Sequence, residues 1–106
     1  MNDNKHIISS NMTLIEALRY INNLAPEPLV LFILDEDKRM VGTLTDGDSR
    51  RALISGASLS DSVDKVMHRN FNFLHKGIDD DVKHLHEQKQ MKMKLVPILD
   101  DDNHIV

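Results

Sequence analysis

The sequence predicts a small α/β (α+β) protein made of two tandem copies of a strand-helix-strand-strand-helix unit, with the second copy incomplete. Three observations predict this class: helical periodicity in residues 13–24, an apolar hairpin pattern in residues 29–45, and recurrence of the hairpin 65 residues later. The chain has 106 residues, of which 41% are hydrophobic and only 4% aromatic. It is therefore long enough for one compact domain, and its core is expected to be aliphatic.

The first helix is predicted by apolar residues that recur three and four positions apart. Thr13 followed by Glu16 is the pattern of a capping box, which marks the start of a helix. Pro26 ends the helix, because proline has no backbone N–H to donate. The apolar stripe consists of Leu14, Ile15, Leu18, Ile21 and Leu24.

A β-hairpin and a second helix follow. LVLFIL at residues 29–34 is a continuous apolar run, as in a strand that is buried on both faces. The acidic turn DEDK separates it from RMVGTLT at residues 39–45, so the two strands are expected to pair. The second helix is predicted over about residues 47–55, with Asp46 as its N-cap and Gly56 as its C-terminal stop.

The repeat is read from two stretches of the same pattern. LDEDKRMV at residues 34–41 aligns with LDDDNHIV at residues 99–106, and the apolar runs before them share one register. A shift of 67 positions aligns residues 15–24 with residues 82–91 in the same way. The second copy reaches Val106, where the first continues with GTLTDGDSRRAL, so we expect the second copy to be truncated.

The predicted domain organisation follows from this repeat. We expect a first repeat at residues 1–57 and a truncated second repeat at residues 71–106. Residues 58–70, rich in Ser and Asp, are expected to form a linker with a short helical turn around residues 63–67.

Composition excludes several classes of function. With 17 acidic and 13 basic residues the net charge is -4, the wrong sign for a nucleic-acid-binding protein. The longest apolar run is too short to span a membrane, and no signal peptide is recognisable, so we expect a cytoplasmic protein. There is no cysteine, and none of the six histidines lies four residues from another. We therefore expect no metal site, and the acidic turns are expected to be hairpin turns only.

These residues carry a resemblance to a known family. Two tandem copies of the unit, the LDEDKRMVGTLTDGD hairpin and the VDKVM segment after it resemble a pair of CBS domains over nearly the whole chain. GTLTDGDSRRAL resembles more narrowly the CBS pairs that precede a sugar-phosphate nucleotidylyltransferase domain. Ser49 departs from that pattern, because the family usually has a bulky apolar residue there, and weaker packing beneath the helix is expected.

The resemblance implies a ligand site at the junction between the second hairpin strand and the second helix. In ligand-binding CBS domains the pattern is a Gly, two apolar residues, a Thr or Ser, two variable residues and an Asp. Here it begins at Gly42, which is expected to border the ligand, and it places the ligand-binding hydroxyl and carboxylate at Thr45 and Asp48. The hydroxyl would bind the phosphate or ribose, and the carboxylate would accept both hydroxyls of the ribose. The implied ligand is AMP, ADP, ATP or S-adenosylmethionine, and no cofactor is required.

The residues at this junction support the same site on physical grounds. A helix N-terminus presents unpaired N–H groups and partial positive charge, so it is a natural site for an anion. Arg50 and Arg51, expected in the first turn, would oppose the helix dipole unless an anion such as phosphate lay nearby. The first strand around Ile7 and Ile8, together with the hairpin, is expected to form the wall of an adenine slot.

Each of these residues also has a purely structural interpretation. Asp46 is expected to be a helix cap, and Asp48 and Thr45 to be either cap or ligand residues. Arg50 and Arg51 are also typical of a solvated helix face. The other interpretation of Gly42 is close approach of another segment of backbone.

The sequence thus favours a regulatory module that senses an adenosine nucleotide and is part of a larger sugar-phosphate nucleotidylyltransferase. The alternative is a ligand-free dimerisation or interaction domain, and a homodimer is expected in either case. No catalytic residues are predicted, so the chain itself is not expected to be an enzyme. The third hypothesis, a phosphate-handling enzyme with Asp46 or Asp48 as nucleophile, lacks a set of metal-binding partners.

Overall fold

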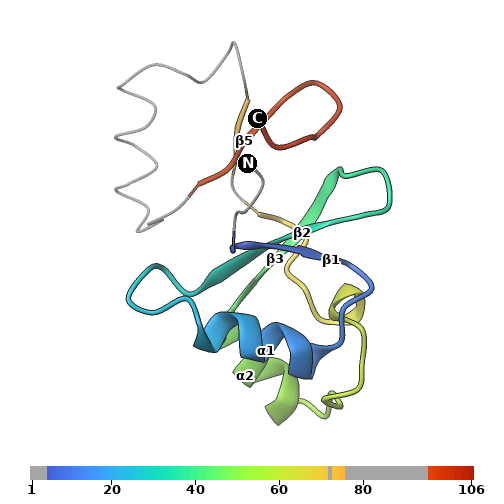
Figure 1. The fold of residues 1–106 in the computed structure, drawn as a ribbon. Helices are drawn as coiled ribbons and strands as arrows, with labels where there is room; N and C mark the ends of the chain where they lie inside the picture. The colour runs from blue at the N-terminus through green and yellow to red at the C-terminus, as the bar shows by residue number, and fades with distance from the viewer. Residues whose placement is uncertain (1–4, 72, 76–95) are drawn as a thin grey trace. The chain divides into compact units, whose positions relative to one another are not determined.

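The computed structural model describes residues 5–71, 73–75 and 96–106 (Figure 1). The chain divides into two compact units, Met1–Phe71 and Asn72–Val106. Each unit is described by itself below. Within the described residues, no helix is long and apolar enough to cross a membrane.

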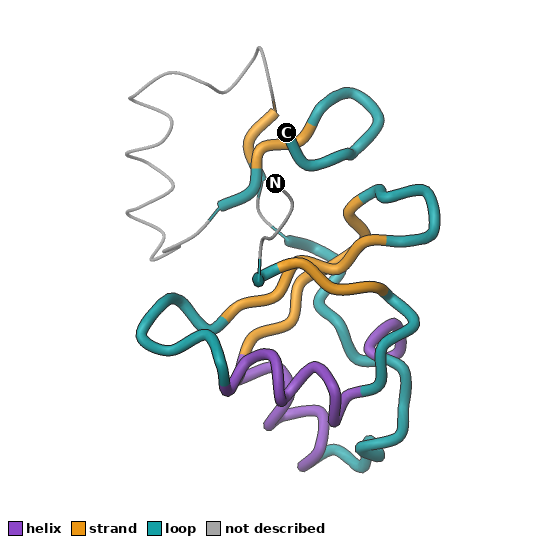
Figure 2. Tube along the Cα trace, in the orientation of Figure 1, coloured by secondary structure: helices purple, strands orange, loops and turns teal. Residues whose placement is uncertain are grey.

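The first unit has the predicted order of elements, which confirms the α+β fold class. Its three-stranded sheet has the order β1-β2-β3, with β1 parallel to β2 and β2 antiparallel to β3. Both helices lie on the same side of this sheet (Figures 1 and 2). The elements are β1 (Ile7–Ser9), α1 (Leu14–Asn22), β2 (Val30–Leu34), β3 (Met40–Thr45) and α2 (Asp46–Ile54).

The core of the first unit lies between the sheet and its helices, and it is aliphatic as predicted. Ile8, Leu31, Ile33 and Leu44 point from the sheet into it, at alternating positions of each strand. They pack against Leu14, Ala17 and Ile21 of α1, against Leu24 in the turn after α1, and against Val63 and Met67.

The capping box predicted at the start of α1 is present. The backbone N–H of Thr13 donates to Glu16 Oε1 at 3.1 Å, and the Thr13 side chain accepts from the Glu16 N–H at 3.4 Å. The backbone hydrogen bond from Thr13 lowers the pKa of Glu16 below the ordinary value of 4.5. The helix therefore begins where the local sequence predicts.

Residues 58–70, predicted as a linker, lie within the first unit and pack against its core. They contain a 3-10 turn, η1 (Val63–Lys65), and the Val63 side chain is fully buried in the core. Backbone hydrogen bonds attach the segment to the start of α1, with Leu14 N donating to Asp61 O and Val63 N donating to Met12 O, both at 2.8 Å. The predicted domain boundaries themselves stay a prediction.

The described part of the second unit repeats the strand pairing of the first. β4 (Leu74–His75) pairs in parallel with β5 (Ile98–Leu99), and Leu99 forms an antiparallel bridge with Ile105. The first unit likewise has one parallel strand pair, β1 with β2, and one antiparallel pair, β2 with β3. The helix predicted over residues 82–91 lies outside the described residues.

The two hairpin turns confirm that the sequence repeat is also a structural one. Lys38 and Asn103, 65 positions apart, both have a left-handed backbone, with φ of 66° and 67°. Oδ1 of Asp35 and of Asp100 each accepts two backbone N–H groups, from Asp37 and Arg39 in the first turn and from Asp102 and His104 in the second. The N–H of His104 holds the pKa of Asp100 below its ordinary value. The acidic residues thus shape the turns, as predicted.

Candidate functional site

The candidate site begins where β3 runs directly into α2. Thr45 is the last residue of β3 and the N-cap of the helix, so the prediction of Asp46 as N-cap is wrong. The Thr45 side chain accepts a hydrogen bond from the Asp48 N–H at 3.0 Å, and Asp48 Oδ2 accepts one from the Thr45 N–H at 3.0 Å. This second capping box is the physical reason, because it satisfies two otherwise unpaired N–H groups at once.

Two ion pairs balance the charge along the first two turns of α2. Arg50 pairs with Asp46, and Arg51 Nη2 donates to Asp48 Oδ1 at 2.8 Å. The arginines lie in the second turn rather than the first, because α2 begins at Asp46. Both side chains are exposed and reach back to the carboxylates, which by themselves account for the two positive charges.

Ser49 is a small, polar residue of α2, and it is fully buried. Its hydroxyl donates to the backbone O of Thr45 at 3.0 Å, which satisfies the group. It is the buried residue of α2, while Leu53 and Ile54 are exposed. The apolar contact between this helix and the sheet is therefore small, as the departure at Ser49 predicts.

Gly42 lies in β3, on the face of the sheet that points to the core. A Cβ at this position would lie 2.6 Å from Met67 Sδ and 3.1 Å from the backbone O of His68. Thr43 and His68 bridge the same two segments with backbone hydrogen bonds of 2.9 and 2.8 Å. Close approach of residues 67–68 therefore explains the glycine without a ligand.

Ile7 and Ile8 point to opposite faces of β1. Ile8 is 4% exposed and belongs to the core, whereas Ile7 lies on the other face. Both line a pocket with the turn between β2 and β3; its other residues are Ser9, Asn11, Leu34, Asp35, Glu36 and Lys38.

The structure does not join all seven predicted site residues in one pocket. Thr45 pairs with Val30 at the start of β2, whereas the pocket of Ile7 and Ile8 lies at the end of β2, near Leu34. Four residue steps of about 3.3 Å separate the two positions, or roughly 13 Å. Thr45, Asp48, Arg50 and Arg51 form one group, and the two isoleucines belong to another.

A buried histidine that the sequence did not single out lies at the same end of the sheet as Thr45, across β2. His6 is 6% exposed, and its Nδ1 is 2.9 Å from the backbone O of Val30, the residue that pairs with Thr45. Its Nε2 is 3.6 Å from Glu27 Oε1. The ion pair with Lys5 lowers the pKa of Glu27. No sequence signal marks His6 beyond its place before two apolar residues.

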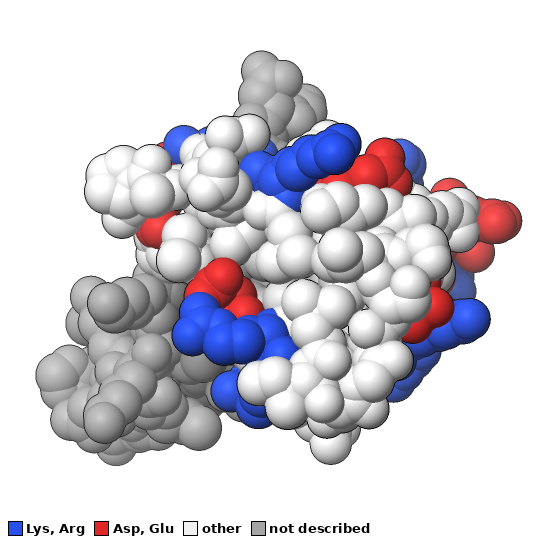
Figure 3. Space-filling model, turned by 90° about the horizontal axis from the view of Figure 1, so that it is seen from below, with Lys and Arg blue, Asp and Glu red and all other residues white. Residues whose placement is uncertain are grey.

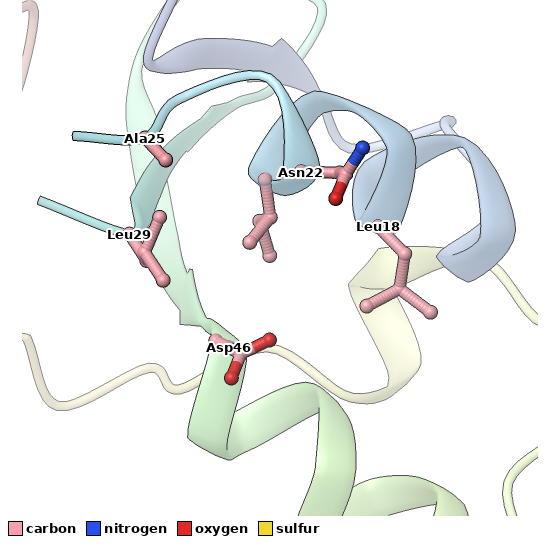
Figure 4. A pocket seen from close by; sticks show the side chains of 6 residues that line it. Leu18, Asn22, Ala25, Leu29 and Asp46 are labelled. Atoms are coloured by element: carbon pink, nitrogen blue, oxygen red, sulfur yellow. The ribbon is translucent and has the colours of Figure 1, made fainter. Parts of the chain in front are cut away.

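A further pocket lies on the helix side of the sheet, beside the start of α2. Figure 4 shows it between Leu18 and Asn22 of α1, the connection to β2, and Asp46. Its lining residues are Leu18, Ile21, Asn22, Ala25, Leu29 and Asp46. None of the seven predicted site residues is among them.

Within the described residues, no group of three or more His, Asp or Glu side chains is placed to hold a metal ion. The carboxylates of α2 are paired with arginines rather than with one another.

Among the comparisons with known proteins, only those with solved structures gave matches, and these agree on the fold. No protein-family model and no curated protein matches the sequence. Among solved structures, the CBS domain pair of protein MJ0100, crystallised with 5′-methylthioadenosine and S-adenosyl-L-methionine, is 27% identical with a TM-score of 0.69. That match covers 96% of this chain and 82% of the other.

Two other solved structures extend this likeness. The CBS domains of a transcriptional regulator from Streptococcus pneumoniae have a TM-score of 0.73 at 14% identity, covering 96% of this chain and 80% of theirs. The cytosolic domain of the Mg2+ channel MgtE in complex with ATP has a TM-score of 0.71 at 20% identity. This match covers 94% of the chain but only 39% of the MgtE chain. The chain thus has the fold of CBS domains.

Proposed function

We propose that this chain is a cytoplasmic regulatory module that senses an adenosine nucleotide at the junction of β3 and α2. The observation that carries the proposal is the CBS fold combined with a hydroxyl and a carboxylate, Thr45 and Asp48, at that junction. Structures of the same fold were crystallised with adenosine compounds: S-adenosyl-L-methionine and 5′-methylthioadenosine in one case, ATP in another.

The proposed contacts follow from the chemistry of the side chains. The Asp48 carboxylate accepts hydrogen bonds from the ribose hydroxyls, and the Thr45 hydroxyl contacts the phosphate or the ribose. Arg50 and Arg51 are exposed and flexible enough to meet a phosphate at the positive end of α2. Gly42 and Ile7 are proposed to border the ligand, although Gly42 also has a packing role.

Isothermal titration calorimetry with AMP, ADP, ATP and S-adenosylmethionine tests this proposal. We expect measurable heat and saturable binding for at least one compound at millimolar concentration. GTP at the same concentration serves as the control for nonspecific binding of phosphate. Absence of binding by all four adenosine compounds would reject the nucleotide-sensing function.

The second candidate function is a dimerisation domain that binds no ligand. It is favoured by the capping box, which already accounts for Thr45 and Asp48, and by the surface on the helix side of the first unit. That surface has a large uncharged area with charges mostly at its margin (Figure 3). The exposed large apolar residues of the first unit are Tyr20, Leu29, Leu53, Ile54 and Leu59, with Ile54 80% exposed.

We propose that the chain forms a homodimer whether or not it binds a nucleotide, because a monomer would leave these apolar side chains in water. Sedimentation velocity at tens of micromolar is expected to show a dimer. Ile54→Glu should shift the protein toward monomer, since it places a charge on the most exposed apolar residue. A monomer at all concentrations in the unmodified chain would contradict the proposal.

We further propose that the module regulates a sugar-phosphate nucleotidylyltransferase. The support is the resemblance of GTLTDGDSRRAL, residues 42–53, to the CBS pairs of such enzymes. The coding sequence that flanks residues 1–106 in the genome tests this assignment directly. A neighbouring domain of another class would overturn it.

A further inference from the structure

The contacts of Asp48 affect which adenosine compounds the proposed site can accept. The inference drawn from them rests on the proposed function. Oδ2 of Asp48 accepts the Thr45 N–H at 3.0 Å, and Oδ1 accepts Arg51 Nη2 at 2.8 Å. The Asp48 side chain is 21% exposed, against 72% for Arg51. A ribose that approaches Oδ1 therefore competes with the Arg51 guanidinium for the space in front of it.

The Arg51 guanidinium also lies over the first turn of α2, beside Gly47. A Cβ at Gly47 would be 3.2 Å from Arg51 Nη1 and 3.5 Å from Nη2. A positive charge at this end of a helix is unfavourable against the helix dipole, and the Asp48 carboxylate offsets this. A phosphate at the same place would be a stronger, bidentate partner for the guanidinium and would also be favoured by the dipole.

We propose that Arg51 is a specificity-determining residue that makes the site select phosphorylated adenosine ligands. A phosphate draws the guanidinium away from Asp48 and so frees Oδ1 for the ribose hydroxyls. Adenosine lacks the phosphate, so nothing draws Arg51 away from Asp48, and the ribose contact is made only at the cost of the ion pair.

Calorimetric titration of AMP and adenosine into the unmodified chain and into Arg51→Gln tests the proposal. We expect the unmodified chain to bind AMP at least about tenfold more tightly than adenosine, because one charge-assisted contact to phosphate is gained. Arg51→Gln should weaken AMP binding about tenfold. It should leave adenosine binding unchanged or tighten it up to about fivefold, since an exposed ion pair is weak. The ratio of the two affinities should then approach one.

Arg69→Gln is the matched control. Arg69 carries the same charge and is 60% exposed, but it pairs with Asp64 and is not one of the predicted site residues. Its replacement removes equal charge and should leave most of the preference for AMP. Since both arginines are exposed, both variants should keep the melting temperature and circular dichroism spectrum of a folded protein.

The outcomes separate the inference from the proposed function. Equal affinity for AMP and adenosine in the unmodified chain would overturn the selection by phosphate and leave the nucleotide site standing. An unchanged affinity ratio in Arg51→Gln, or an equal loss of preference in Arg69→Gln, would overturn the role of Arg51. If the unmodified chain binds neither compound, the proposed function fails together with the inference.

Discussion

Asp48→Ala is expected to weaken the binding of AMP about ten- to a hundredfold, measured by calorimetry. The substitution removes the proposed hydrogen bonds from the ribose hydroxyls to a charged acceptor, worth roughly 1.5–3 kcal/mol. It also removes one half of the capping box with Thr45, so a lower melting temperature is expected as well. Binding is therefore compared at a temperature at which both proteins are fully folded.

Glu16→Ala is the matched control for this experiment. Glu16 has the same place in the capping box of α1 that Asp48 has in that of α2, at the third position of the helix. Its loss should lower stability in the same direction and leave AMP binding unchanged. If Asp48→Ala binds AMP as well as the unmodified chain does, the junction is a helix cap only, and the ligand-free dimerisation function replaces the nucleotide-sensing one.

Gly42→Ala is expected to destabilise the protein by about 1–3 kcal/mol, the usual cost of inserting atoms into a packed core. The new methyl group would lie 2.6 Å from Met67 Sδ, and Met67 is 8% exposed. The backbone O of His68 would lie 3.1 Å from the same methyl group, so the methyl group has little room to move away from Met67. Urea denaturation followed by circular dichroism measures the free energy of unfolding.

Two further variants make the Gly42 result specific. Gly47→Ala adds the same methyl group in the first turn of α2, where it meets only the end of the exposed Arg51 side chain, so no loss of stability is expected. Met67→Ala should cost less in the Gly42→Ala background than alone, because the truncated side chain makes room for the methyl group. A Gly42→Ala protein as stable as the unmodified one would contradict the packing explanation and return Gly42 to the ligand site.

The site was predicted less completely than the fold. Thr45 and Asp48 lie close together as the motif predicts, but they are also hydrogen-bonded to each other. The motif alone does not show these hydrogen bonds. Arg50 and Arg51 were expected to need an external anion, and they have carboxylates of the same helix as partners. His6 contacts Val30, 24 residues away, at the same end of the sheet as Thr45, and only pairing of β1 with β2 brings His6 and Val30 together.

The sequence by itself determined the features that depend on neighbours within a few residues. The start of α1 at the Thr13–Glu16 capping box, the stop at Gly56 with its φ of 107°, and the two matching hairpin turns are local, since their hydrogen bonds span three to five residues. Only the tertiary structure shows why Gly42 is a glycine and how residues 58–70 pack against the start of α1 and the core. Those features depend on contacts between segments that are distant in the chain, and a local residue pattern does not show which distant segment packs against it.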